Sequence, residues 1–559
     1  MSSHPNVILV VTDDQGYGDV ACHGNRVLST PHLDRLHADG VDLTDFHVSP
    51  TCAPTRAALL TGRYDDRVGV WHTINGRSIL PRSEVTMADV FADAGYRTGM
   101  FGKWHLGDNH PFRPTDRGFD EALIHGGGGV AQTPDYWGND YFDDIYRRNG
   151  KPEQVDGYCT DVWFDEAIDF IDRHRDEPFF CYVATNAPHA PLQVPQAYWA
   201  PYADTVPEDV ARFYGMIANI DENVGRLRAH LDERGLAEET MIVFLGDNGS
   251  AQPYYNAGMR GAKGSPYDGG HRVPCVMLWP GRYETRTLDW LAAHYDLLPT
   301  LIESCGLSAP DVTFDGISLH AALGGETADP PDRMVFVDSQ RVETPRKWKD
   351  SAVCTDRWRL VRGEELYDIV ADPGQTDDIA ADHPDVVADL RVAYEAWWED
   401  MQPFPPLPAP TVDSGVCPVV LTAHDWHDTD TVPWNQGHIL EGMDATGSWV
   451  IDVREPGTYR FELRRWPPEC TASVTGLPET FTEMDYGTPD GDWTAVAVAL
   501  PASTARLWVG DDVESAPVSD EDSTVTFERA LSTGRQPVLA TFETADTARG
   551  AYYVRITPA

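Results

Sequence analysis

The chain has 559 residues, more than one compact hydrophobic core holds, so we expect two or three domains. Its 42% hydrophobic and 24% charged residues are typical of a folded protein and argue against disorder. The formal net charge of -46 repels nucleic acid and anionic lipid, so neither is an expected partner, and an anionic substrate needs a local cluster of positive charge.

The first predicted element is an apolar strand that follows Met-Ser-Ser-His-Pro. No basic stretch leads into a long apolar one there, so we expect no signal peptide, and no later segment has the length to span a bilayer. We therefore expect a cytoplasmic protein without a membrane partner. The nine cysteines have neither paired nor metal-ligand spacing, which fits a reducing compartment. We expect eight of them to be small core residues.

Along the first three quarters of the chain, β-branched segments alternate with amphipathic helical ones. This alternation predicts an α/β fold, with a mostly parallel sheet flanked by helices. Helices are predicted at 87–94 and 210–231, and strands at 7–11, 98–101, 179–184 and 241–245. A polar cluster follows each of these strands. Because ligands bind beyond the carboxyl ends of such strands, we expect one site to collect all four clusters.

The pattern changes after residue 333. A small α+β subdomain is predicted by two short strands and a helix, at 350–353, 358–361 and 384–398. A proline-rich segment at 403–410 is predicted to be a stiff linker. Alternating segments beyond it predict an appended all-β sandwich, at 449–453, 458–463 and 551–556. The expected domains are 1–333, 334–402 and 411–559.

Acidic residues stand at the ends of the first and last of the four strands. Asp13-Asp14 follows the first, and Asp247-Asn248 follows the last. Adjacent carboxylates are costly unless a positive group neutralises them, and a divalent cation does this best. Taken alone, such a pair is more often a turn or a helix cap. Four oxygen donors without clustered Cys or His predict a hard ion, Ca2+ or else Mg2+, rather than zinc.

The most specific segment is Cys52-Ala-Pro-Thr-Arg56, which leads through helix-forming residues to Leu60-Thr-Gly-Arg63. Cys52 is therefore expected at a helix N-terminus, where backbone amides favour an anion. A structural cysteine before a helix is common, but this combination of residues is not. The segment resembles the motif of the type I, formylglycine-dependent sulfatases, an arylsulfatase-like family of the alkaline phosphatase superfamily.

The resemblance extends over roughly residues 5–400, with its motifs in family order. Gly102-Lys103-Trp-His105-Leu-Gly107 matches a family motif, and Ala187-Pro-His189-Ala-Pro191 resembles another. Lys263 stands in the segment 261–274, which resembles the family's lysine loop. Lys103 and Lys263 are two of only five lysines in the chain. The departures, Asp268 for the more usual Glu and Thr55 for Ser, are conservative.

The resemblance implies an alkaline-phosphatase-like fold with a sulfatase catalytic domain in 1–333. It implies that a maturation enzyme oxidises Cys52 to formylglycine and that the hydrated aldehyde attacks the sulfate ester. The implied metal ligands are Asp13, Asp14, Cys52, Asp247 and Asn248. The other implied catalytic residues are Lys103, Lys263 and His189, which hold sulfate oxygens, His105, which acts as a base, and Arg56, which orients the nucleophile. Lys263 or His189 is expected to protonate the leaving alcohol.

The alcohol part of the substrate is expected to be a sulfated saccharide. A glycine-rich lead at 126–129 precedes aromatic and amide residues, which suit a sugar-binding wall or, equally, an ordinary ordered loop. The candidate substrate-binding residues are His72, Gln132, Asp135, Tyr136, Trp137 and Asn139, with Trp71, Asn75 and Arg77 as possible additions. In the predicted sandwich, His424, Trp426, Trp434 and Gln436 either contact a glycan or, more commonly for such groups, seal a domain interface.

Two alternatives remain open from the sequence. A phosphonate monoester or phosphodiester hydrolase would use an overlapping nucleophile and metal site. An inactive glycan-binding protein would keep Cys52 as a thiol, although the complete set of lysines and histidines argues against it.

Overall fold

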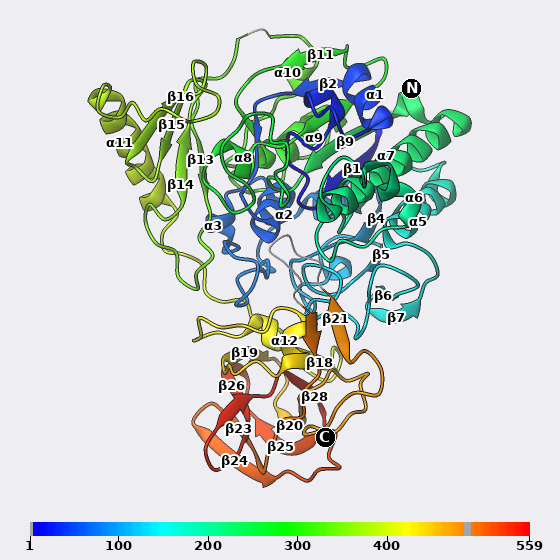
Figure 1. The fold of residues 1–559 in the computed structure, drawn as a ribbon, viewed down its shortest axis with the longest axis vertical. Coiled ribbons are helices and arrows are strands. Elements are labelled where there is room, and N and C mark those ends of the chain that lie inside the picture. Colours follow the sequence, from blue (N-terminus) through cyan, green and yellow to red (C-terminus); the bar gives the residue numbers. More distant parts are fainter. Residues whose placement is uncertain (1–3, 328, 486–493) are drawn as a thin grey trace.

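The chain folds into one large helix-covered sheet, a small sheet with a long helix, and a group of antiparallel sheets near the C-terminus (Figure 1). The computed structural model describes residues 4–327, 329–485 and 494–559. The predicted class, α/β with a small α+β part and an appended all-β part, is confirmed. The strands and helices predicted from the sequence are present; 179–184 and 358–361 have the predicted ends, and the ends of the others are shifted.

The large sheet has ten strands, and its central ones are parallel. The order is β11 (Arg286–Leu288), β2 (Val41–Leu43), β10 (Cys275–Leu278), β9 (Thr240–Gly246), β1 (Asn6–Thr12), β8 (Phe179–Ala184), β4 (Arg97–Gly102), β5 (Glu121–Ile124), β6 (Ile145–Arg148) and β7 (Lys151–Gln154). Strands β9, β1, β8, β4 and β5 pair in parallel, whereas β10, β6 and β7 are antiparallel to their neighbours. All four strands predicted from the sequence lie next to one another in this central group.

Helices cover both faces of this sheet, as the fully buried sequence of β1 requires. Ile8 and Val10 pack toward α1 (Pro31–Asp39), α5 (Cys159–His174) and α7 (Glu208–Arg234). Val7, Leu9 and Val11 pack toward α2 (Cys52–Thr61), α4 (Met87–Asp93) and α9 (Leu297–Cys305). Because successive strand side chains point to opposite faces, one apolar segment fills both cores.

Helix α7 is longer than the predicted 210–231 at both ends. Its first turn carries Glu208 and Asp209, which favour a helix N-terminus, and Gly235 ends the helix in the left-handed conformation. These terminal residues are polar, so the hydrophobic periodicity does not include them.

The α+β part is a four-stranded antiparallel sheet with α11 (Pro384–Asp400) on one face. Its strands are β13 (Val335–Asp338), β14 (Ser351–Cys354), β15 (Trp358–Val361) and β16 (Glu365–Asp368). Its other face packs against Tyr295 and α2 of the large sheet's layer. Arg359 of β15 forms an ion pair with the buried Asp268 of the segment 261–274 at 3.0 Å. This ion pair links the α+β part to the part that contains the large sheet.

Residues 411–485 and 494–559, called the β region below, form two main sheets that share a core (Figure 1). One contains β17 (Thr411–Val412), β19 (Ser448–Val453), β26 (Gly534–Glu543), β23 (Thr504–Val509) and β24 (Asp512–Pro517), with β27 (Ala548–Gly550) beside β26. The other contains β18 (Val419–Thr422), β28 (Tyr553–Pro558), β20 (Gly457–Arg464) and β25 (Val525–Leu531). Figure 1 places this region beside the loops at one edge of the large sheet.

The smaller described elements are α3 (Asp65–Val68), α6 (Gln196–Trp199), α8 (Asp268–His271), α10 (His320–Leu323), α12 (Gln436–Glu441), β3 (Phe46–His47), β12 (Ala292–Ala293), β21 (Glu483–Asp485) and β22 (Thr494–Val496). Among the described residues, no helix combines the length and the apolarity that crossing a membrane requires. All nine cysteines are free thiols, but Cys22 is exposed and Cys417 is half-buried. The expectation that all eight cysteines other than Cys52 lie in the core is therefore wrong for these two.

Candidate functional site

The four strands that carry polar residues at their carboxyl ends are neighbours, in the order β9, β1, β8, β4. Because they are parallel, their carboxyl ends meet at one edge of the sheet. Helix α2 begins at Cys52, which follows the extended Thr51, and it ends at Gly62 in the left-handed conformation. The residues brought to this edge are Asp13 and Asp14 after β1, Lys103 and His105 after β4, His189 after β8, and Asp247 and Asn248 after β9.

A buried cluster of acidic groups surrounds Cys52. One ligand atom from each of Asp13, Asp14, Cys52 and Asp247 lies within 4.8 Å of all the others. Asn248 donates its side-chain amide to Asp14 Oδ1 at 2.8 Å. Within the described part of the chain, Asp13 Oδ1 and Asn248 Oδ1 are buried without a hydrogen-bond partner. Unpaired buried oxygens that face neighbouring carboxylates fit the coordination of a hard divalent cation.

Three cationic side chains neutralise the three carboxylates. Lys103 Nζ lies 2.6 Å from Asp13 Oδ2, and Lys263 Nζ lies 2.5 Å from Asp14 Oδ1. Arg56 donates two hydrogen bonds to Asp247 Oδ2, at 3.0 and 2.8 Å, and a third to the Lys103 carbonyl at 2.9 Å. The cluster is thus close to neutral as it stands, and a divalent cation would leave it positive toward an anionic substrate.

Burial and neighbouring charges shift the protonation of this cluster. Burial alone would raise the pKa of Asp14, but Lys263 and His189 outweigh burial and hold this pKa well below its usual value. Burial and Asp13 raise the pKa of Asp247 to about 6, although Arg56 opposes them. Burial and Asp13 also raise the pKa of the Cys52 thiol to about 12, so the unmodified side chain stays protonated at neutral pH.

Both motif histidines line a pocket together with Cys52. His189 Nε2 is 3.9 Å from Asp14 Oδ2, and its Nδ1 is bonded to the carbonyl of Ala190. His105 has φ 58 and places its Nε2 3.0 Å from the Thr73 carbonyl, whereas its Nδ1 is buried without a hydrogen-bond partner among the described residues. Burial, and then Lys263, lowers the pKa of His189 to about 3; burial and Lys103 lower that of His105 well below its usual value.

A pocket of about 290 Å³ opens above Cys52. Eight of its lining residues are among those singled out from the sequence: Cys52, His72, His105, Gly128, Gln132, His189, Lys263 and Trp434. The other three are Thr73, Ile74 and Arg341. Arg341 had no sequence signal, because it lies outside every motif. Trp434 was noted in the sequence only as a possible glycan contact.

The glycine-rich lead at 126–129 is required by close packing. A Cβ atom on Gly128 would lie 2.2 Å from the His105 ring, and one on Gly126 would lie 2.2 Å from the Pro134 carbonyl oxygen. The loop therefore presses directly on the histidine that lines the pocket.

Most of the expected sugar-binding wall lies away from this pocket. Asp135 accepts hydrogen bonds from the Gly126 and Ala131 amides and from Asn139, so it holds the loop together. The ring of Trp137 packs edge-on against Trp466 and Phe481 of the β region. Of the six candidates only His72 and Gln132 line the pocket. Trp137 packs against the β region, whereas the side chains of Asp135 and Asn139 bond within the loop and to Ile145.

The additional candidates also make structural contacts. Trp71 is buried, with its indole N–H bonded to the Val342 carbonyl and Arg77 stacked 4.2 Å from its ring centroid. Asn75 donates to the carbonyls of Trp426 and Thr429 in the β region.

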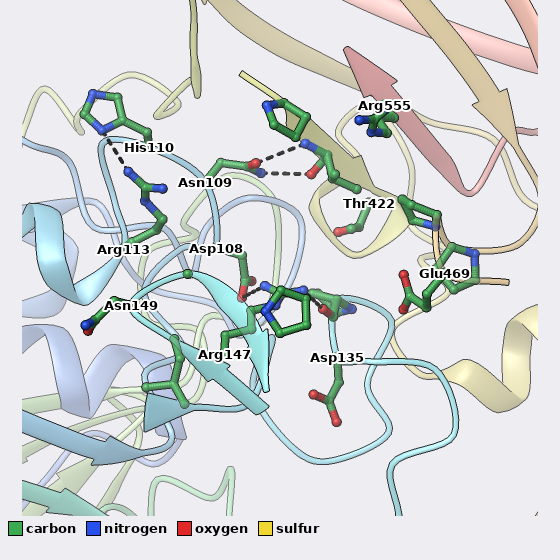
Figure 2. A pocket seen from close by; sticks show the side chains of 18 of the residues that line it. Asp108, Asn109, His110, Arg113, Asp135, Arg147, Asn149, Thr422, Glu469 and Arg555 are labelled. Atoms are coloured by element: carbon green, nitrogen blue, oxygen red, sulfur yellow. Dashed lines mark hydrogen bonds and ion pairs between the residues drawn. The ribbon is translucent and has the colours of Figure 1, made fainter. Parts of the chain in front are cut away.

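A second cavity, of about 310 Å³, lies at the seam between the large sheet's loops and the β region (Figure 2). Its walls include Asp108, Asn109 and Arg147 on one side and Glu469 and Arg555 on the other. Arg147 pairs with Asp108 at 3.2 Å, and the Asn109 amide bonds both backbone groups of Val420. These groups stabilise the seam, and none of the four clustered ligand residues lines this cavity.

Comparison with known proteins identifies the family. The sulfatase family model matches residues 5–307. Human arylsulfatase A is 32% identical over 431 residues, which cover 69% of this chain and 81% of the relative. The N-acetylgalactosamine-6-sulfatase of Canis lupus familiaris is 32% identical over 360 residues, which cover 58% of this chain and 67% of the relative.

Solved structures agree with the sequence relatives. The structure of Ps i-CgsB in complex with k-i-k-neocarrahexaose has a TM-score of 0.66 and 29% identity, and the match covers 71% of this chain and 94% of that one. PsFucS1 sulfatase from Pseudoalteromonas sp., at 21% identity and a TM-score of 0.62, shares the fold over 72% of this chain and 92% of that one. The alkaline-phosphatase-like fold predicted from the motifs is therefore confirmed. The chain belongs to the type I sulfatase family and is a sulfuric ester hydrolase.

Proposed function

We propose that this protein hydrolyses the sulfate monoester of a sulfated carbohydrate, with formylglycine at position 52 as the nucleophile and a divalent cation, preferentially Ca2+, beside it. The observation that carries this proposal is the position of Cys52. It begins α2 among Asp13, Asp14 and Asp247, and Lys263 lines the same pocket.

The donor set supports the cation. Asp13, Asp14, Asp247 and Asn248 offer hard oxygens, and two of those oxygens lack a hydrogen-bond partner in the described residues. Such a set suits Ca2+, with Mg2+ as the alternative. A bound cation would supply Lewis acidity to a sulfate oxygen and would lower the pKa of a hydroxyl at position 52.

Side chains of the protein itself bind the sulfate group. Lys263 and His189 line the pocket beside Cys52, and Lys103 is held next to Cys52 by Asp13. We assign these three residues to the oxygens of the substrate sulfate, where the fixed positive charge of the two lysines stabilises the charge that develops during displacement. Either Lys263 or His189 delivers the proton to the leaving alcohol.

Arg56 and His105 complete the site. Through its three hydrogen bonds, Arg56 fixes Asp247 and the main chain at Lys103, so we assign it the role of positioning the acidic cluster. We assign His105, whose Nδ1 lacks a hydrogen-bond partner among the described residues, as the base that serves the nucleophile.

Conversion of Cys52 requires a maturation enzyme, which we propose as a partner of this chain. The hydrate of formylglycine supplies an attacking hydroxyl and a second hydroxyl, whose deprotonation releases sulfate and regenerates the aldehyde. A plain alcohol or thiol at this position has no second hydroxyl. Turnover therefore depends on the modification.

The carbohydrate assignment rests on the relatives and on the pocket. One similar structure contains k-i-k-neocarrahexaose, and one relative is named for N-acetylgalactosamine 6-sulfate. In this chain an aromatic ring, an amide and an imidazole lie around the catalytic residues, from Trp434, Gln132 and His72. Such a combination suits a sugar ring.

Release of inorganic sulfate from a panel of defined sulfated saccharides tests this function. We expect release by protein produced with its maturation enzyme and none by Cys52→Ala. A parallel assay with an aryl sulfate and an aryl phosphonate ester separates the sulfatase from a phosphonate hydrolase. Faster turnover of the phosphonate would favour that alternative, and saccharide binding without release of either group would favour an inactive glycan-binding protein.

A further inference from the structure

The β region contributes a side chain to the catalytic pocket. Trp434, in the segment between β18 and α12, lines this pocket together with Cys52, His105, His189 and Lys263. The indole ring is half-buried, whereas the neighbouring Pro433 and Asn435 are buried. The sheet edge that provides the chemistry and the β region thus share one cavity.

Main-chain and amide groups hold the Trp434 segment in place. Thr133 donates its backbone N–H to the Trp434 carbonyl at 3.1 Å and its hydroxyl to the Pro433 carbonyl. The Gln436 side chain donates to the carbonyls of Gln132, Asp135 and Tyr136, at 3.3, 3.2 and 3.1 Å, and accepts from the Gly138 amide at 3.0 Å. These bonds seal the interface through main-chain and amide groups, and the indole of Trp434 lines the pocket.

The β region also anchors a second segment that lines the pocket. Asn75 donates its backbone N–H to the His424 carbonyl at 3.0 Å, and its side chain donates to the carbonyls of Trp426 and Thr429. The adjacent residues His72, Thr73 and Ile74 line the pocket. Both pocket loops, 72–75 and 128–132, are therefore anchored to the β region, and a pre-anchored wall loses little entropy when ligand binds.

Trp434 differs from Trp137, the aromatic residue expected from the sequence to meet the sugar. Trp137 packs against Trp466 and Phe481 inside the seam. The ring of Trp434 makes an edge-on contact with His438, at a centroid separation of 5.4 Å, and borders the cavity above Cys52. The aromatic residue that lines the pocket is thus Trp434 of the β region and not Trp137.

We propose that Trp434 is a specificity-determining residue of this sulfatase and that its indole face stacks on the sugar ring that carries the sulfate. The inference rests on the proposed carbohydrate sulfatase function and deepens it. The pocket, of about 290 Å³, is at the low end of the range of about 300 to 1,000 Å³ for small-molecule sites, so it holds one sugar ring beside the sulfate. The substrate class is accordingly a saccharide sulfated on a terminal residue.

The first experiment compares Trp434→Ala and Trp434→Phe with the wild-type protein. The matched control is Trp508→Ala, because Trp508 is half-buried in β23 of the same region and does not line the pocket. KM and kcat are measured for a sulfated monosaccharide and for 4-nitrophenyl sulfate. In the Cys52→Ala background, calorimetry gives the Kd of the same monosaccharide without turnover.

For Trp434→Ala we expect KM and Kd for the sugar to rise about tenfold, the size of one lost aromatic contact, while kcat changes less than about threefold. Trp434→Phe retains most of the affinity, and Trp508→Ala behaves as wild type. Unchanged sugar affinity in Trp434→Ala would overturn the assignment. Equal losses of affinity in Trp434→Phe and Trp508→Ala would also overturn it, because they would indicate general damage to the β region.

The second experiment compares two trisaccharides that carry the same sulfate on the terminal or on the internal residue. We expect at least about tenfold higher kcat/KM for the terminal sulfate. Equal rates would contradict a pocket for one ring. Failure of the wild-type protein to release sulfate from any substrate would instead contradict the proposed function, whereas the Kd comparison would still test Trp434.

Discussion

Arg56 offers the sharpest test of the buried charge cluster. Its side chain is fully buried, and it donates two hydrogen bonds to Asp247 and one to the Lys103 carbonyl. Arg56→Met keeps much of the side-chain volume but removes the charge and all three donors. Asp247 is then left beside Asp13 and Asp14 without its nearest cation.

Breaking a buried ion pair by removing one partner costs about 3–5 kcal/mol. A folded protein is stable by only about 5–15 kcal/mol, so we expect Arg56→Met to lose a large fraction of its stability. Arg56→Lys should lose less but still lose stability, because an ammonium group does not reproduce the guanidinium fork. Saturating Ca2+ should raise the free energy of unfolding of Arg56→Met back toward that of the calcium-free wild type, since a ligand at about 100 times its Kd stabilises the folded state by about 2.7 kcal/mol.

Urea unfolding, with Ca2+ and with a chelator, measures these free energies. Arg97→Ala is the matched control, because Arg97 pairs with Glu177 at 3.2 Å with both side chains about half exposed. Such a surface pair contributes about 0–1 kcal/mol. If Arg56→Met loses no more stability than Arg97→Ala in the absence of Ca2+, the account of the buried cluster is wrong.

Three further predictions concern the nucleophile, the metal and a separate carboxyl pair. Cys52→Ala should unfold at nearly the wild-type urea concentration yet release almost no sulfate; a variant with full activity would refute the nucleophile. Chelation should abolish sulfate release and lower the unfolding temperature, and Ca2+ should restore both; indifference to chelation would exclude the cation. Burial raises the pKa of Asp338 to about 6 and that of its neighbour Asp66 well above the usual value, so the folded state keeps protons that the unfolded chain releases above about pH 4. The folded protein therefore becomes less stable as pH rises toward neutrality. Asp66→Asn should be about 1–3 kcal/mol more stable than wild type at pH 8 but not at pH 4.5. A pH-independent difference in urea unfolding would contradict this expectation.

The fold and the centre of the site were predictable from the sequence because their signals are local. The strands after which Asp13, Lys103 and Asp247 stand are short apolar segments, and parallel pairing brings their carboxyl ends together. Cys52 precedes helix-forming residues and begins α2 as expected. Patterns of this kind depend only on neighbouring residues in the chain.

The substrate side of the pocket was not predictable in the same way. Tyr136, Trp137 and Asn139 follow the glycine-rich lead, but Trp137 packs against Trp466 of the β region and the Gly138 amide bonds Gln436 there, away from the pocket. Arg341 and Trp434 come from the α+β part and the β region, and only the contacts among the three parts bring them to Cys52. Such contacts have no periodicity in the sequence, so the hydrophobic pattern does not reveal them.

Position 52, in our proposal, carries an aldehyde beside a cation. Mass spectrometry of the peptide that contains Cys52, from protein made in its native host, tests this claim most directly. We predict that carbonyl oxygen replaces the sulfur in the active protein. A fully unmodified thiol in native protein that still hydrolyses sulfate esters would contradict the account.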